Sequence, residues 1–176
     1  MKNNNLTIGV VGGAGHVGLP LSLLLAKTGF KVHIIDINTD AIGKLKQGDI
    51  PFLEEGAEEL LKEELQKDNL GFSADYEIIP ECDVLILTVG TPVDEHLNPD
   101  LNSVFSVMRM IKPYLLDGQV LLLRSTLFPG TSDKILKFFK SAGLNIGVSF
   151  CPERIAQGYA LKEIATFPQI ISGSDD

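Results

Sequence analysis

The sequence predicts a doubly wound α/β domain, in which a mostly parallel sheet lies between two layers of helices (three-layer αβα). Three observations lead to this fold class. Short apolar runs alternate with longer amphipathic segments along the whole chain. The length of 176 residues suits one compact domain, so we expect residues 1–176 to form a single unit. A glycine-rich turn joins the first apolar run to the next segment, as in a strand–turn–helix unit.

The expected strands are short and apolar, and several are rich in β-branched residues. Residues 84–89 (Val-Leu-Ile-Leu-Thr-Val) are apolar at almost every position, as a central parallel strand buried on both faces should be. In chain order, strands are expected at 6–11, 31–36, 71–74, 84–89, 120–123, 146–150 and 169–172. Because helical segments separate most of them, the connections should be right-handed crossovers between parallel strands.

The expected helices carry apolar residues at helical spacing, and several end at glycine. The first tolerates Pro20 in its first turn, where the missing N–H has no helical partner, and Gly29 should end it. Residues 53–67 are rich in Glu and Leu and predict a longer amphipathic helix with a solvated acidic face. Helices are expected at 19–27, 39–47, 53–67, 101–115 and 131–142, with an irregular stretch around Pro152.

Composition excludes several classes of partner. The formal net charge is −8, and an acidic chain repels nucleic-acid backbones and anionic lipid, so we expect neither as a partner. Cys82 and Cys151 lack the spacing of a metal site, and we expect no metal. No apolar window approaches the roughly 18 residues of a membrane helix, and no signal peptide is recognisable. We therefore expect a cytoplasmic protein.

The turn after the first strand has the spacing G-x-G-x-x-G, formed by Gly13, Gly15 and Gly18. In a Rossmann fold the first glycine permits the turn, the second admits a pyrophosphate, and the third lets the helix approach the strand. The backbone of His16 and Val17 lies at the helix N-terminus, where N–H groups attract phosphate.

Asp36 ends the second strand, about 20 residues past the glycines, where a carboxylate can accept hydrogen bonds from the adenosine ribose. The same carboxylate would repel a 2′-phosphate. The loop and the acid together predict a site for NAD rather than NADP.

A second glycine spacing is also present, because Gly12, Gly15 and Gly18 fit the G-x-x-G-x-x-G of short-chain dehydrogenases and sugar epimerases. Those enzymes need a Tyr-x-x-x-Lys pair. The residues four positions after the tyrosines of this chain are Pro80, Gly118 and Glu163. That interpretation therefore fails within this sequence.

Further motifs follow the later strands. They are Gly-His-Val-Gly-Leu-Pro at 15–20, Gly-Asp-Ile-Pro at 48–51 with Glu-Gly at 55–56, Val-Gly-Thr-Pro at 89–92 with Pro-Asp-Leu at 99–101, Arg-Ser-Thr-Leu-Phe-Pro-Gly-Thr at 124–131, and Cys-Pro-Glu-Arg at 151–154 with Gly158 beyond. In this order the motifs resemble the UDP-glucose/GDP-mannose dehydrogenase family, from about residue 8 to the end. That family oxidises the C6 alcohol of a nucleotide sugar to a carboxylate with two NAD.

The resemblance implies roles for residues in the second half of the chain. Gly90, Thr91 and Ser125 would lie beside the cofactor, with Thr91 near its ribose or diphosphate. Thr126 would lie near the nicotinamide and help to position a catalytic water, and Glu153 would act with it. An oriented water and a nearby carboxylate suit the hydrolysis of a thioester intermediate.

The resemblance also implies that part of the family's machinery is outside this chain. The family's nucleophilic cysteine and catalytic lysine, its central dimer-forming helix and its second Rossmann-like domain would all follow residue 176. We therefore expect a truncated chain, inactive alone and monomeric, from a homodimeric enzyme. Neither Cys82 nor Cys151 matches the nucleophile, and we expect both to serve packing.

The motifs constrain the identity of the substrate less than they constrain that of the cofactor. Arg154 after Pro-Glu, with Gly158 beyond, resembles the branch acting on UDP-N-acetylmannosamine or UDP-N-acetylglucosamine, whereas the UDP-glucose branch more often has Phe there. UDP-glucose stays open as the alternative substrate, and so does a stand-alone NAD-binding regulatory module. Other two-domain NAD enzymes, such as hydroxyacid or 6-phosphogluconate types, share the glycine loop but lack the later motifs.

Overall fold

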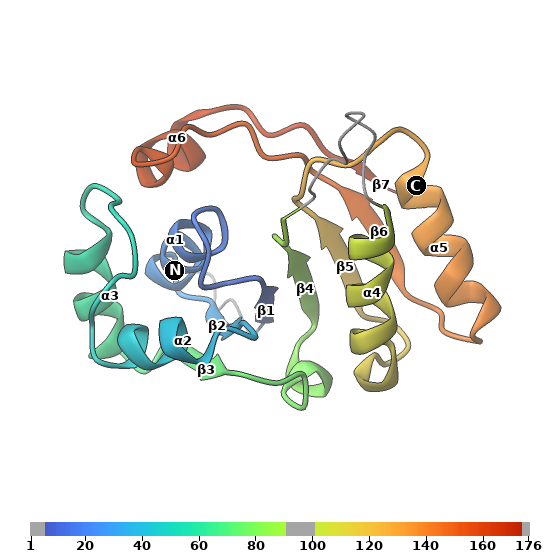
Figure 1. The fold of residues 1–176 in the computed structure, drawn as a ribbon, viewed down its shortest axis with the longest axis horizontal. Coiled ribbons are helices and arrows are strands. Elements are labelled where there is room, and N and C mark those ends of the chain that lie inside the picture. The colour runs from blue at the N-terminus through green and yellow to red at the C-terminus, as the bar shows by residue number, and fades with distance from the viewer. Residues whose placement is uncertain (1–5, 91–100, 174–176) are drawn as a thin grey trace.

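The computed structural model describes residues 6–90 and 101–173. The chain forms a seven-stranded sheet in the order β3-β2-β1-β4-β5-β6-β7, flanked by helices (Figure 1). The strands are β1 (Thr7–Val11), β2 (Lys31–Ile35), β3 (Leu70–Ser73), β4 (Val84–Leu87), β5 (Val120–Leu123), β6 (Gly147–Phe150) and β7 (Ser172–Gly173). The predicted doubly wound α/β fold is confirmed.

The register of the central strands brings their carboxyl ends level. Val11 of β1 pairs with Ile35 of β2 on one side and with Leu87 of β4 on the other. The loops that follow these three strands therefore start at the same edge of the sheet. The strand order reverses between β1 and β4, and ligands of open α/β sheets bind at such a switch point.

Helices cover both faces of the sheet (Figure 1). The α-helices are α1 (Gly18–Lys27), α2 (Thr39–Lys46), α3 (Ala57–Leu65), α4 (Leu101–Ile111), α5 (Thr131–Ser141) and α6 (Ala160–Thr166), and short 3₁₀ turns are η1 (Ile79–Glu81) and η2 (Lys112–Tyr114). None of the helices in residues 6–90 and 101–173 is long and apolar enough to cross a membrane.

The core is divided by the sheet because side chains alternate between its faces. Ile35, Leu85 and Leu87 pack in one cluster with Met108 of α4 and Phe139 of α5. Their strand neighbours point the other way, toward two clusters that contain the apolar faces of α1, α2 and α3. The near-complete burial of both faces explains why the central strands are apolar throughout.

Two predicted helices are shorter in the structure. The helix expected over 53–67 begins only at Ala57, after Gly56 adopts the left-handed conformation (φ 75°), and residues 53–56 form a loop. The helix expected over 101–115 ends at Ile111 and continues as η2, because Pro113 has no N–H to donate.

The region after β6 differs more from the secondary structure predicted for it. The predicted irregular stretch contains a short helix, α6, which the sequence pattern did not reveal. The last strand, expected over 169–172, consists of Ser172–Gly173 and shares only Ser172 with the expected range; it runs antiparallel to β6. Figure 1 shows the chain leaving β6, crossing to α6 beside α1, and returning to β7.

Candidate functional site

The glycine loop turns back over the end of the sheet directly after β1. The N–H groups of Gly12 and Gly13 both donate to the carbonyl of Ile35, at 2.9 and 3.2 Å, which ties the loop to β2. Gly12 has a φ of 81°, a conformation that side chains disfavour. α1 starts at Gly18 with Val17 as its N-cap, so the N–H groups of this turn have no acceptor within the helix.

The three motif glycines are required for two different reasons. A Cβ on Gly13 would lie 2.6 Å from the carbonyl oxygen of Val10, and one on Gly18 would lie 2.4 Å from that of Gly12. These two positions are closed by the protein's own backbone. A Cβ on Gly15 would meet only the Gly12 oxygen at 3.4 Å, and Gly15 lines the cleft beside the loop. Bare backbone thus faces the cleft at Gly15, as a bound diphosphate requires.

Asp36 joins the end of β2 to the glycine loop. Its Oδ2 accepts a hydrogen bond from the Ala14 N–H at 3.0 Å, and its Oδ1 accepts one from the Asn38 N–H at 3.0 Å. The carboxylate is half-buried and lines the same cleft as Gly15. Each carboxylate oxygen has further acceptor capacity, so Asp36 can hold the loop and still accept hydrogen bonds from a ribose.

The cleft has a volume of about 310 Å³, within the range of small-molecule sites. Its lining is mostly apolar, and Asp36 is the charged residue in it. Burial, with a smaller contribution from the charge of Asp36, raises the pKa of Tyr76, so its phenol stays neutral. The cleft is lined by Val11, Gly12, Gly15, Ile35, Asp36, Ile37, Tyr76, Thr88, Val89, Gly90, Val107 and Met110. An adenosine needs an apolar surface for its base and acceptors for its ribose, and this cleft offers both.

Thr88 and Ser125 connect the second half of the chain to this cleft. The Thr88 hydroxyl lies 3.0 Å from the carbonyl oxygens of both Val11 and Gly12, to which it can donate. Ser125 is buried and donates from Oγ to the Val89 carbonyl at 2.6 Å. Ser125 was predicted to contact the cofactor and stays a prediction. Thr88, which lines the cleft, was not predicted, although a hydroxyl near the end of an otherwise apolar run was the available signal.

The other predicted cofactor residues are placed as follows. Gly90 lines the cleft, and Thr91 lies outside the described residues. Val17 is half-buried at the start of α1. The exposed ring of His16 lies against Phe52, with ring centroids 4.0 Å apart, so this side chain contacts the loop between α2 and α3.

Arg124 is the centre of a buried polar cluster at the ends of β5 and β6. It is 4% exposed, and its Nη2 forms an ion pair with Oε2 of Glu153, whose side chain is 9% exposed. Its Nη1 donates to Gln169 Oε1 at 2.6 Å and to Cys151 Sγ at 3.0 Å. The second oxygen of Glu153 accepts from the Arg154 N–H at 2.8 Å. The Glu153 carboxylate is therefore held in one orientation by a cation that no sequence motif had assigned to it.

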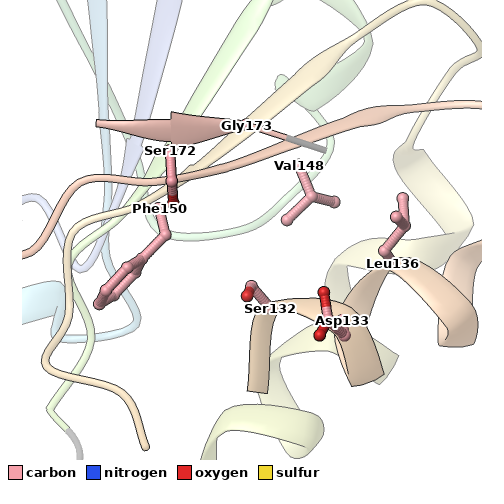
Figure 2. A pocket seen from close by; sticks show the side chains of 7 residues that line it. All are labelled: Ser132, Asp133, Leu136, Val148, Phe150, Ser172 and Gly173. Carbon is pink, nitrogen blue, oxygen red and sulfur yellow. The ribbon is translucent and has the colours of Figure 1, made fainter. Parts of the chain in front are cut away.

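Thr126 is exposed and follows this cluster along the chain. Beyond it, a pocket of about 250 Å³ is lined by Leu127, Phe128, Pro129, Gly130, Ser132 and Phe150. A neighbouring hollow between α5 and the strands β6 and β7 is only about 40 Å³ (Figure 2). That hollow is far too small for a dinucleotide and shares no residue with the cleft at the glycine loop.

No group of three or more metal-ligating side chains occurs within residues 6–90 and 101–173. Both cysteines are free and buried. Burial, with smaller contributions from Glu81 and Asp83, raises the pKa of Cys82 to about 12, so this thiol stays protonated at neutral pH.

A glycine loop at the switch point, an acid on the neighbouring strand and a cleft between them define a dinucleotide-binding domain. Residues 6–176 match the model of the "UDP-glucose/GDP-mannose dehydrogenase family, NAD binding domain". The chain belongs to this family.

Its relatives include enzymes that act on N-acetylated sugars. A UDP-N-acetyl-D-mannosamine dehydrogenase of Methanococcus aeolicus is 36% identical over 165 residues, which are 92% of this chain and 37% of the relative. A UDP-N-acetyl-D-glucosamine 6-dehydrogenase of Pseudomonas aeruginosa is 32% identical, over 97% of this chain and 40% of its own. The structure of the UDP-N-acetyl-mannosamine dehydrogenase Cap5O from Staphylococcus aureus superposes with a TM-score of 0.87 at 34% identity, over 96% of this chain and 42% of the other. The chain thus spans about two fifths of the length of these relatives.

Proposed function

We propose that this chain binds NAD in the cleft at the glycine loop and serves as the cofactor half of a UDP-sugar 6-dehydrogenase. The observation that carries the proposal is the combination of open backbone at Gly15 with the carboxylate of Asp36 in one cleft. The diphosphate of NAD would lie against the backbone of Gly15, His16 and Val17, where a helix N-terminus favours negative charge. The adenosine ribose would bind Asp36.

The other half of the cofactor would extend toward the ends of β4 and β5. Gly90, Thr91, Ser125 and Thr126 are the residues proposed to contact it. When bound, NAD supplies a hydride acceptor. The buried bonds of Ser125 to the carbonyls of Leu87 and Val89 support a fixed floor for that half of the site.

Thr126 and Glu153 are proposed to position the water that hydrolyses the covalent intermediate. A hydroxyl can orient a water by a hydrogen bond, and a carboxylate held in place can accept the proton of that water. The ion pair with Arg124 supports this role for Glu153, because it fixes the carboxylate at the end of β6.

The proposed substrate of the complete enzyme is a UDP-N-acetylhexosamine, whose C6 alcohol is oxidised to a uronate with two NAD. Support comes from Arg154 and Gly158 in the motif after β6 and from the names of the relatives. UDP-glucose is the alternative. Since the chain spans about two fifths of its relatives, we propose that turnover requires the remaining part of a longer protein, which would also form the homodimer.

Calorimetric titration with NAD and with NADP tests the cofactor assignment. We expect NAD to bind at least about tenfold more tightly, because a 2′-phosphate close to a carboxylate costs on the order of 1 kcal/mol or more. The variant Asp36→Asn should reduce this preference, and Asp40→Asn, an exposed carboxylate in the first turn of α2, should not. Equal affinity for both nucleotides would contradict the role of Asp36, and the absence of binding would contradict the cofactor assignment.

Turnover is tested by following NADH formation with UDP-N-acetylmannosamine, UDP-N-acetylglucosamine and UDP-glucose. The 176-residue chain should produce no NADH with any of them. An enzyme-like rate with any of these sugars would show that the chain contains a complete site and would contradict the proposal.

A further inference from the structure

Glu54 is a buried carboxylate outside the cofactor cleft. It is 6% exposed, and it lies in the loop that was expected to be the first turn of a helix. Its Oε2 accepts a hydrogen bond from the Gly158 N–H at 3.0 Å, and its Oε1 accepts one from the Leu161 N–H at 3.1 Å. The N–H of Glu55 donates in return to the carbonyl of Gly158 at 3.2 Å. Three hydrogen bonds thus join the loop before α3 to the segment that follows β6.

These bonds account for the burial of a charge. No salt bridge to Glu54 occurs among the residues that the structure describes. Its hydrogen bonds from backbone N–H groups therefore offset the cost of burying the carboxylate. A buried carboxylate is costly unless it is well hydrogen-bonded. The Glu54 side chain is therefore fixed in one position, and it fixes the backbone at Gly158 and Leu161 with it.

The same loop also contacts the glycine loop. Phe52, two residues before Glu54, packs its ring against His16 at a centroid distance of 4.0 Å. His16 stands between Gly15 and Val17, at the turn where the diphosphate is proposed to bind. The loop 52–56 therefore contacts the glycine loop through Phe52 and the segment after β6 through Glu54, which binds Gly158.

We propose that Glu54 is a positioning residue that couples the cofactor loop to the segment after β6. It holds the backbone at Gly158 and Leu161 against the loop 52–56, and the packing of Phe52 on His16 transmits the binding of NAD at the glycine loop to that segment. This inference rests on the proposed binding of NAD. A coupling of this kind requires a test in which one end is occupied and the other is observed.

Amide hydrogen exchange of the 176-residue chain, with and without saturating NAD, provides that test. The readout is the exchange rate of the Gly158 and Leu161 amides. Three variants are compared with the parent chain. Glu54→Gln keeps the size of the side chain and removes its charge, and Phe52→Leu keeps an apolar contact and removes the ring. Glu55→Gln is the matched control, because Glu55 is exposed and its side chain has no hydrogen bond among the described residues.

Gln retains one acceptor oxygen, so the amide that faces its NH2 group loses its acceptor. Without NAD, that amide should exchange at least about tenfold faster in Glu54→Gln than in Glu55→Gln, the size expected for the loss of a hydrogen bond to a charged group. Phe52→Leu should leave these rates near those of the parent chain. NAD should slow exchange at both amides in the parent chain and in Glu55→Gln. It should have no such effect in Glu54→Gln or Phe52→Leu, although both variants still bind NAD.

Each contrary result has a distinct meaning. Equal exchange rates in Glu54→Gln and Glu55→Gln without NAD would overturn the positioning role. NAD binding that leaves Gly158 and Leu161 unchanged in the parent chain would overturn the coupling and leave the proposed cofactor function intact. Failure of the parent chain to bind NAD would overturn the cofactor function, and the coupling with it.

Discussion

Replacing Arg124 by methionine should destabilise the domain by about 3–5 kcal/mol, the range found when one partner of a buried ion pair is removed. The structure explains why the effect should be this large. The substitution removes the contacts of the guanidinium to Glu153, Gln169 and Cys151. It leaves the carboxylate of Glu153, with a side chain only 9% exposed, with a single hydrogen bond from the Arg154 N–H.

Urea denaturation followed by circular dichroism measures this loss of stability. For a domain of this size the same loss corresponds to a decrease in melting temperature of roughly 6–20 °C. Arg109→Met is the matched control, since Arg109 is exposed on α4 and its side chain forms an exposed hydrogen bond with Ser106 one turn away. Its effect should stay within about 0.5 kcal/mol.

A double-mutant cycle with Glu153→Gln separates the pair from its surroundings. The double variant should be more stable than the sum of the two single effects predicts, by roughly 0.5–3 kcal/mol. A loss below about 1 kcal/mol in Arg124→Met, or strictly additive effects, would refute the idea that Arg124 holds Glu153 in place.

Three further predictions concern other parts of the domain. Gly18→Ala should lower the free energy of unfolding by about 1–3 kcal/mol and abolish NAD binding, because its Cβ would overlap a backbone oxygen of the glycine loop at 2.4 Å. Gly43→Ala, with open space around it in α2, should raise the free energy of unfolding by up to about 1 kcal/mol. Burial lowers the pKa of His33, and Lys31 lowers it further, so the unfolded chain binds a proton that the folded domain resists. The contribution of His33 to stability is complete above about pH 6.5 and is lost as pH falls through the lowered pKa. The free energy of unfolding from urea denaturation should therefore decrease as pH falls in the parent chain, and decrease less in His33→Gln. Cys82, with its pKa near 12, should not react with a thiol reagent at pH 8 while the domain is folded, and rapid labelling there would contradict its burial.

The sheet and the glycine loop were predictable because their signals are local. The run at 84–89 is apolar on both faces, and β4 occupies its first four positions. The G-x-G-x-x-G spacing places its glycines where the structure requires them, and Asp36 directly follows β2 beside them. Such patterns depend only on neighbours along the chain, so the strand and the glycine loop can be predicted from the sequence alone.

The contacts that complete the site were not predictable in the same way. Glu54 and the residues on either side of it fit an amphipathic helix, yet Glu54 instead binds backbone more than 100 residues away. Arg124 gave no sign of its partner, because Glu153 reaches it only when β5 and β6 pair. Long-range pairing decided both conformations, and local propensity had little influence on either. The motif order did point to Glu153 through the resemblance, but it could not reveal the cation beside it.

Chemical-shift mapping of the ¹⁵N-labelled chain during an NAD titration tests the central claim most directly, because it locates the cofactor. The largest changes should occur at the amides of Gly13, Gly15 and Val17, with smaller ones at Asn38, whose N–H binds Asp36. Amides at the β7 edge of the sheet, such as Gly173 and the adjacent Ser132 of α5, which both line the hollow of Figure 2, should stay unchanged. Changes centred on that edge, or none at the glycine loop at saturating NAD, would contradict the account.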